Sequence, residues 1–191
     1  MKILFASQNV NKVKEISKLL PEHIEIIGLK DIGFTEDIPE TAETLQGNAI
    51  MKAKYLANQL DYPIFADDTG LEIDALNGEP GVYSARYAGE DKNANKNMDL
   101  VLEKLKGESN RNAQFRTVIS FEVKGENYCF EGKVEGEICE ERSGTEGFGY
   151  DPIFKPNGFN TTFAEMSLDA KNKISHRGRA VTKFIEFLKS Y

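Results

Sequence analysis

The stretch FADDTGLEID, residues 65–74, places two adjacent aspartates directly after a short apolar run. Aspartate is a poor strand former and is rarely buried without a partner, and two neighbouring carboxylates repel each other. Ligand sites in α/β sheets open at the carboxyl ends of strands. Asp67 and Asp68, with Glu40 from an earlier loop, would therefore make a set of oxygen ligands suited to Mg²⁺. The letters DDTG are equally typical of an Asx turn that ends a strand, so both interpretations stay open.

Strand and helix patterns alternate outward from this stretch. The strand patterns cover residues 2–6, 24–28, 62–66, 113–123 and 130–138. The helical patterns cover residues 7–20, 44–60, 98–105 and 181–188. The first three elements predict a right-handed βαβ unit, and the turn KGEN predicts a long antiparallel hairpin. We therefore expect one α/β domain over residues 1–191, a mixed twisted sheet with flanking helices, in two lobes with a central cleft.

Composition narrows the classes of partner. The 191 residues are 40% hydrophobic and 29% charged, as in an ordinary soluble globular protein. A formal net charge of -7 disfavours a nucleic-acid binder but leaves room for a small anionic ligand held by a few lysines. The two cysteines predict no disulfide framework, and no run is apolar enough for a signal peptide or a membrane helix. We expect a cytoplasmic protein without membrane or nucleic-acid partners.

Two lysines lie where an anion would bind. The segment ASQNVNK, residues 6–12, follows the first predicted strand and opens a helix. Exposed amides at a helix start, with the Ser7 and Asn9 side chains, make an anion site one turn before Lys12. An ordinary N-cap beside a solvated lysine explains the same letters. Lys52 lies on the apolar stripe of its helix, where a lysine either extends to the surface or contacts an internal anion.

Two later segments have the composition of a nucleotide site. GTEGFGYDPIF, residues 144–154, alternates glycines with aromatics, so Phe148 and Tyr150 could stack a planar base, although packing on the core explains the same pattern. KNKISHRGRA, residues 171–180, gathers basic side chains before a predicted helix with Ser175 as its candidate N-cap. Positive charge opposes the helix dipole there, which indicates an anion, although a solvated basic turn has the same composition.

Together these motifs resemble the inosine/xanthosine triphosphate pyrophosphatases. The match runs nearly end to end, through SQNVNKVKE, PET, NAIMKA, FADDTGLEIDALNGEPGVYSARYAG, FGYDPIF and SHRGRA. The resemblance implies Mg²⁺-dependent hydrolysis of non-canonical purine nucleoside triphosphates (ITP, dITP and XTP) to the monophosphate and pyrophosphate. It also implies a homodimer that removes deaminated purines from the nucleotide pool.

The resemblance assigns roles to individual residues. The implied metal ligands are Glu40, Asp67 and Asp68, and Asp68 is also the implied catalytic acceptor. The implied substrate-binding residues are Ser7, Gln8, Asn9, Lys12, Lys52, Thr69, Phe148, Gly149, Tyr150, Asp151, Lys171, His176 and Arg177. Thr69 stands where the family often has serine. QGNA replaces the frequent EENA, so Gly47 removes one possible acidic neighbour.

The implied chemistry is physically consistent. An aspartate with a pKa of about 3.9 is a weak base, so the metal must acidify the attacking water. Hydrogen-bond donors facing the six position of the purine would favour keto bases, and the candidates are loop amides, His176 and Arg177. Two alternatives compete, a Maf-like pyrophosphatase for modified pyrimidine nucleotides and a non-catalytic nucleotide sensor. FGYDPIF and SHRGRA argue against the first, and the retained carboxylates argue against the second.

Overall fold

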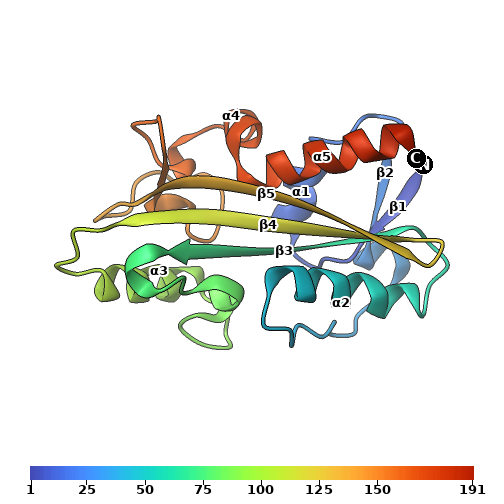
Figure 1. Cartoon of the computed structure of the whole chain (residues 1–191), viewed down its shortest axis with the longest axis horizontal. Helices are drawn as coiled ribbons and strands as arrows, with labels where there is room; N and C mark the ends of the chain where they lie inside the picture. Colours follow the sequence, from blue (N-terminus) through green and yellow to red (C-terminus); the bar gives the residue numbers. More distant parts are fainter. The chain divides into compact units, whose positions relative to one another are not determined.

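A computed structural model describes all residues, 1–191, as a mixed α/β fold around one six-stranded sheet (Figure 1). The strands are β1 (Lys2–Phe5), β2 (Glu25–Gly28), β3 (Ile64–Ile73), β4 (Asn112–Val123), β5 (Glu126–Ile138) and β6 (Phe154–Pro156). They are ordered β2-β1-β3-β4-β5-β6. The helices are α1 (Val10–Ser17), α2 (Leu45–Ala57), α3 (Ala94–Lys104), α4 (Leu168–Ile174) and α5 (His176–Ser190). The predicted mixed sheet with flanking helices is confirmed.

The chain divides into two compact units. The first unit consists of Met1–Asp68, Thr117–Gly132 and Arg177–Tyr191. The second consists of Thr69–Arg116 and Lys133–His176. β3, β4 and β5 contribute residues to both units, and the division within β3 falls directly after Asp68. The predicted cleft and the single-domain organisation stay predictions.

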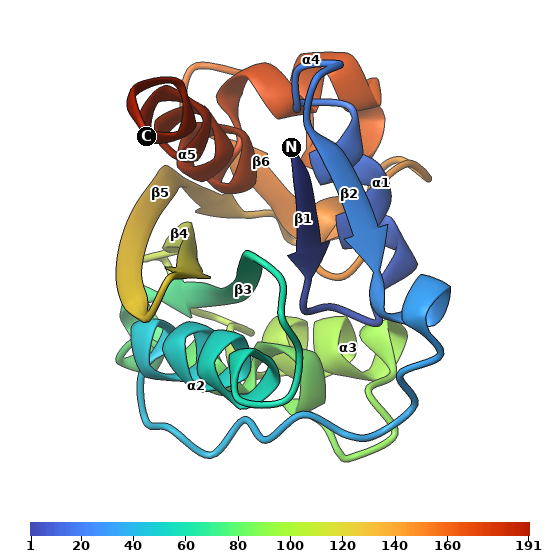
Figure 2. The ribbon, with the colours of Figure 1, turned by 90° about the vertical axis from the view of Figure 1, so that its right-hand side faces the viewer.

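Strand alternation sorts the buried side chains of the first unit into two cores. β1 pairs in parallel with both β2 and β3. Phe5 and Phe65 pack in one core with residues of α1 and α5, whereas Leu4 and Ala66 pack in another with residues of α2. Figure 2 shows α2 on one side of these strands and α1 and α5 on the other. Strands covered on both faces are apolar at successive positions, as β1 is.

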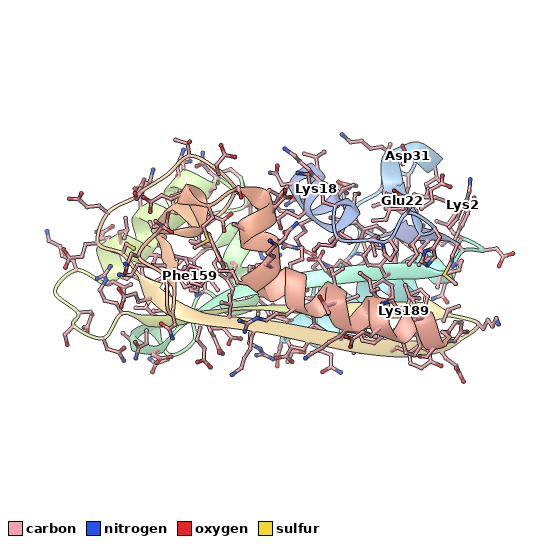
Figure 3. All side chains as sticks on the ribbon, turned by 90° about the horizontal axis from the view of Figure 1, so that it is seen from above. Lys2, Lys18, Glu22, Asp31, Phe159 and Lys189 are labelled. Carbon is pink, nitrogen blue, oxygen red and sulfur yellow. The ribbon has the colours of Figure 1, made fainter.

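The helices of the first unit that cover these cores are amphipathic. Ile16 of α1 and Phe184 of α5 are fully buried, while Lys18 and Lys189 are exposed (Figure 3). This division between an apolar and a charged face is what the helical spacing of the sequence predicts. Burial of the apolar stripe fixes which residues of each helix point toward the sheet, and that orientation places the polar residues described below.

The second unit has a core of its own. Ile73 of β3, Met98 of α3 and Phe115 of β4 pack there with Phe154 and Phe163. α3 begins after Asn93, whose side chain accepts a hydrogen bond from the third residue of the helix. β6 pairs antiparallel with the end of β5.

The predicted hairpin of β4 and β5 is confirmed. Its turn consists of Lys124 and Gly125, with φ angles of 51° and 79°. Two positive φ angles in a two-residue connection define a type I′ turn, whose twist matches that of the strands. Glycine suits the second position because it carries no side chain that would clash there.

Three predicted elements differ from the structure. β3 does not end at the aspartates but continues to Ile73, so the strand-ending Asx turn is wrong. α1 ends at Ser17 rather than at Leu20. The basic segment 171–180 is not a turn before one helix: it forms the end of α4 and the start of α5, with Ser175 between them. α4 was missed because its seven residues are too few to show a helical period.

Phe65→Ala should destabilise the protein by about 3–5 kcal/mol, because it removes a fully buried ring and leaves a cavity. The Phe65 ring stacks on Phe5 with centroids 4.4 Å apart. The measurement is the free energy of unfolding in urea. Tyr62→Ala, two residues before the strand and 41% exposed, is the control and should change stability by about 0.5 kcal/mol or less. Similar losses for the two variants would contradict this packing.

Candidate functional site

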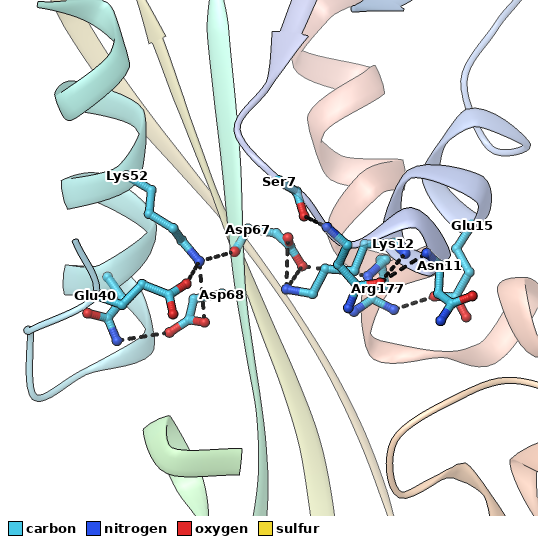
Figure 4. A network of polar contacts seen from close by, with 11 residues as sticks. Ser7, Asn11, Lys12, Glu15, Glu40, Lys52, Asp67, Asp68 and Arg177 are labelled. Carbon is cyan, nitrogen blue, oxygen red and sulfur yellow. Dashed lines mark hydrogen bonds and ion pairs between the residues drawn. The ribbon is translucent and has the colours of Figure 1, made fainter. Parts of the chain in front are cut away.

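Asp67 and Asp68 direct their carboxylates to opposite faces of β3. Successive side chains of a strand alternate between its faces. Asp67 therefore follows Phe65 onto the face that α1 and α5 cover, and Asp68 follows Ala66 onto the face that α2 covers. Figure 4 shows separate sets of polar partners on the two sides of the strand. This separation reduces the repulsion that two adjacent carboxylates would otherwise have.

The Asp67 carboxylate is fully buried beside two cations. Lys12 Nζ lies 2.9 Å from Oδ2 and 3.0 Å from Oδ1, and Arg177 Nε lies 3.6 Å from Oδ2. Arg177 also forms a buried ion pair with Glu15. Burial acts to raise the pKa of Asp67, but the charges of Lys12 and Arg177 outweigh it and hold that pKa at about 2. Asp67 is therefore an anion at neutral pH.

The start of α1 supplies Lys12 to this cluster. Asn9 caps the helix by accepting hydrogen bonds from two backbone N–H groups of the first turn, and Ser7 Oγ accepts one from Asn9. Gln8 Nε2 donates to the backbone carbonyl of Glu36. The N-cap interpretation is thus confirmed for Asn9. The solvated lysine is not, because burial lowers the pKa of Lys12 and its side chain is only 15% exposed.

Lys52 is the cation on the Asp68 side. Its Nζ lies 2.6 Å from Glu40 Oε1, 2.7 Å from the backbone carbonyl of Asp67 and 3.6 Å from Asp68 Oδ1. The alternative in which Lys52 contacts an internal anion is therefore right, and extension to the surface is wrong. Burial acts to lower the pKa of Lys52, but the carboxylates of Asp68 and Glu40 together raise it above its ordinary value. Lys52 is an ammonium at neutral pH.

Asn48 joins Asp68 to the loop before α2. Its Nδ2 donates to Asp68 Oδ2 over 3.1 Å, and its Oδ1 accepts from the Ala42 N–H over 2.9 Å. Burial raises the pKa of Asp68. Gly47 permits the close approach of this loop, since a Cβ there would lie 2.7 Å from the Ala42 Cβ and 2.9 Å from Thr44 Oγ1, which caps α2.

In the second unit, Asp151 organises the loop 147–151. Its Oδ2 accepts a hydrogen bond from the Phe148 N–H over 2.8 Å and pairs with Lys171 Nζ over 2.6 Å. Lys171 Nζ also lies 5.1 Å from the centroid of the Phe148 ring, a cation–π distance. Both charged side chains are 3% exposed. Because buried charges require partners, this pair fixes the position of the half-buried aromatic ring.

Two side chains predicted to bind a base lie in the core instead. The Tyr150 ring is buried, its hydroxyl donates to the Ser84 carbonyl over 2.7 Å, and burial raises the pKa of Tyr150. The His176 ring is buried against Phe115, with centroids 4.6 Å apart. Packing on the core is therefore the correct interpretation for Tyr150. The half-buried members of the predicted set in this unit are Thr69, Phe148 and Gly149.

The three predicted carboxylate ligands do not form one cluster. Glu40 and Asp68 share Lys52, but the Asp67 carboxylate lies on the other face of β3. No group of three His, Cys, Asp or Glu side chains is arranged to hold a metal ion. The prediction that Asp67 joins the other two is wrong because adjacent residues of a continuous strand alternate in direction.

Glu15 and Asn48 belong to the site but were not predicted from the sequence. Each lies three or four helical positions from a predicted lysine, Glu15 from Lys12 and Asn48 from Lys52. That spacing puts each pair on one helix face. A polar residue at this spacing from a lysine on an apolar stripe was the available signal.

Comparison with known proteins identifies the relatives of this chain. The sequence profile of the Ham1 family matches residues 3–187. This chain belongs to the Ham1 family. A dITP/XTP pyrophosphatase of Flavobacterium johnsoniae is 58% identical over 188 residues, covering 98% of each chain. The dITP/XTP pyrophosphatase of Bacillus subtilis is 47% identical and covers 98% of this chain and 96% of its own.

Solved structures of the Ham1 family have the same fold. The Staphylococcus aureus Ham1 protein matches with a TM-score of 0.90 at 41% identity, covering 100% of this chain and 99% of its own. A HAM1 protein from Coxiella burnetii matches with a TM-score of 0.91 at 40% identity over the full length of both chains. None of the helices in this Ham1 chain has both the length and the apolar character that a membrane span requires.

Part of the predicted ligand set in this Ham1 chain fits a divalent cation. Mg²⁺ is commonly held by one or two carboxylates, with water and substrate phosphates completing its coordination. Glu40 and Asp68 provide two carboxylates that converge on one positive charge, the Lys52 ammonium. Oxygen donors gathered around a cation suit Mg²⁺, and the site fits the metal with two protein ligands rather than three.

The acid stability of this Ham1 protein should depend on Asp67. Its folded-state pKa of about 2 lies below the ordinary 3.8, so its contribution is complete above about pH 4 and is lost as the pH falls through about 2. The pKa difference corresponds to about 2 kcal/mol. Between about pH 4 and pH 2, the free energy of unfolding of Asp67→Asn should therefore fall by about 2 kcal/mol less than that of the wild type. Urea titrations at these pH values measure both. Asp37→Asn, at an exposed position, should keep the wild-type profile.

Gly147→Ala should destabilise the protein more than Gly149→Ala. Both glycines have positive φ, 74° and 64°, which costs another residue about 1–2 kcal/mol. An added Cβ at Gly147 would also lie 2.1 Å from Asp151 Oδ2, whereas none of the surrounding atoms lies within 4 Å at Gly149. Disturbing the buried pair of Asp151 and Lys171 should raise the loss to at least about 3 kcal/mol. Equal losses in urea unfolding would contradict the role given to Asp151.

Proposed function

We propose that this Ham1 chain hydrolyses non-canonical purine nucleoside triphosphates, dITP, ITP and XTP, to the monophosphate and pyrophosphate with Mg²⁺. The observation that carries the proposal is the convergence of Glu40, Lys52 and Asp68 in a chain 58% identical to a dITP/XTP pyrophosphatase. Phosphoryl chemistry depends on positioning and charge stabilisation, and a buried lysine beside two carboxylates offers both.

The phosphate-binding role falls to the first unit. Lys12, Lys52 and Arg177 carry the positive charge, and the start of α1, which follows Ser7, Gln8 and Asn9, adds the positive end of a helix dipole. Asp67 holds two of these cations in place rather than binding metal, which is supported by its contacts with Lys12 and Arg177. Fixed cations lose little entropy when the triphosphate binds, so they favour a defined substrate position.

The chemical step would depend on Asp68. Mg²⁺ held by Glu40 and Asp68 would supply charge neutralisation for the phosphate oxygens and would lower the pKa of the attacking water. Asp68 accepts the proton of that water. Asn48 holds the carboxylate in one orientation through its hydrogen bond.

The base-binding role falls to the second unit. Phe148 offers the half-buried aromatic face, and the Asp151–Lys171 pair fixes the loop that carries it. Amides of the loop beside Gly149 supply donors that favour the keto group of hypoxanthine and xanthine over the amino group of adenine. Thr69 completes the contact set, and Tyr150 supports the loop from the core through its hydrogen bond to the Ser84 carbonyl.

We also propose that the protein is cytoplasmic and, as the resemblance in the sequence implies, a homodimer. Size-exclusion chromatography with light scattering tests this assembly. A mass equal to one chain of 21.4 kDa would contradict the dimer without affecting the proposed reaction.

Asp68→Asn should keep the fold and reduce turnover of dITP by at least about a hundredfold, because it removes both a metal ligand and the proton acceptor. The measurement is pyrophosphate release with and without Mg²⁺, on dITP, XTP, dGTP and dATP. Asp61→Asn, at an exposed position, is the matched control and should retain wild-type turnover.

Three outcomes would contradict the proposed function. Wild-type turnover in Asp68→Asn would show that catalysis does not require the Asp68 carboxylate. Equal rates on all four nucleotides would remove the keto-base selectivity. Binding of dITP without release of pyrophosphate would make the protein a nucleotide sensor instead of an enzyme.

A further inference from the structure

The Lys52 ammonium lies where the two carboxylates of the Asp68 side converge. Its Nζ is 2.6 Å from Glu40 Oε1 and 3.6 Å from Asp68 Oδ1. The side chain is 6% exposed, and it reaches this position from the buried face of α2 between Ala49 and Leu56. A divalent cation that bound both carboxylates would take the place of the Lys52 ammonium, both in space and as their counterion.

Displacing Lys52 has a cost that depends on what replaces its partners. A buried ammonium deprived of its anionic neighbours is strongly unfavourable. A metal ion that binds alone would occupy Glu40 and Asp68 and would leave the Lys52 ammonium without these anionic partners. A metal ion that arrives with a triphosphate brings phosphate oxygens, which are strong acceptors for an ammonium. The two ligands should therefore bind cooperatively, and linkage makes that coupling reciprocal.

We infer that Lys52 is an internal counterion that keeps Glu40 and Asp68 from binding a divalent cation until the triphosphate arrives. The inference rests on the proposed function, because it takes the triphosphate as the ligand that receives Lys52. It adds an order to that function: metal enters with the substrate, and Lys52 moves from the carboxylates to the phosphates. The substrate-free protein then does not hold metal in a site that would otherwise be fully formed.

Mn²⁺ binding to the substrate-free protein, followed by electron paramagnetic resonance, tests the inference. Lys52→Met should bind Mn²⁺ about tenfold or more tightly than the wild type, within the usual range of coupling between ligands. Lys54→Met, on the exposed face of the same helix, should bind like the wild type. Lys12→Met removes a charge beside Asp67 on the other face of β3, so it should tighten Mn²⁺ binding far less than Lys52→Met.

The results separate the inference from general electrostatics and from the proposed function. Equal tightening in the Lys12 and Lys52 variants would overturn it, because loss of charge alone would then explain the effect. If Lys52→Met does not fold, Lys52→Gln replaces it in the Mn²⁺ measurement. In the wild type, Mn²⁺ should bind about tenfold or more tightly with α,β-methylene-dITP present, and equal affinity would also overturn the inference. Wild-type protein that releases pyrophosphate from dITP but fails these tests would retain the proposed function alone.

Discussion

Two adjacent carboxylates are buried in the middle of a continuous strand, and the alternation of β3 makes this possible. Each carboxylate leaves the strand in the opposite direction and meets cations held by different helices. A strand that turned at this position would leave the two charges together in solvent. A strand that ran through with apolar residues would remove the carboxylate beside Lys12 and would leave Lys52 and Arg177 with Glu40 and Glu15 alone, and an uncompensated buried charge costs several kcal/mol.

The cations occupy their positions because of apolar packing. α1 and α2 pack their apolar faces against opposite faces of the same strands. Each helix carries one lysine on its buried side, Lys12 in α1 and Lys52 in α2. Buried ion pairs of this kind contribute little net stability, since desolvation offsets most of the attraction. Their value lies in geometry: the charged groups are held in single positions by the cores around them, as binding a polyanion requires.

The sequence predicts this architecture better than it predicts the directions of its side chains. Helical and alternating patterns identify most of the elements and the hairpin, because periodicity reflects burial directly. The letters DD do not tell whether the strand stops or continues, so Asp67 was grouped with Asp68. The seven residues of α4 give no period, and Asn48 and Glu15 appear as ordinary polar residues. Their roles depend on which side chain of another segment lies opposite, which only tertiary packing determines.

The first unit is assembled from three segments that lie far apart in the sequence, Met1–Asp68, Thr117–Gly132 and Arg177–Tyr191. Glu15 and Asp67 belong to the first of these segments, but the guanidinium that contacts both belongs to the third. The charge network therefore forms only when segments far apart in the sequence have packed together, so a chain without residues 177–191 would lack it however well its strands had paired.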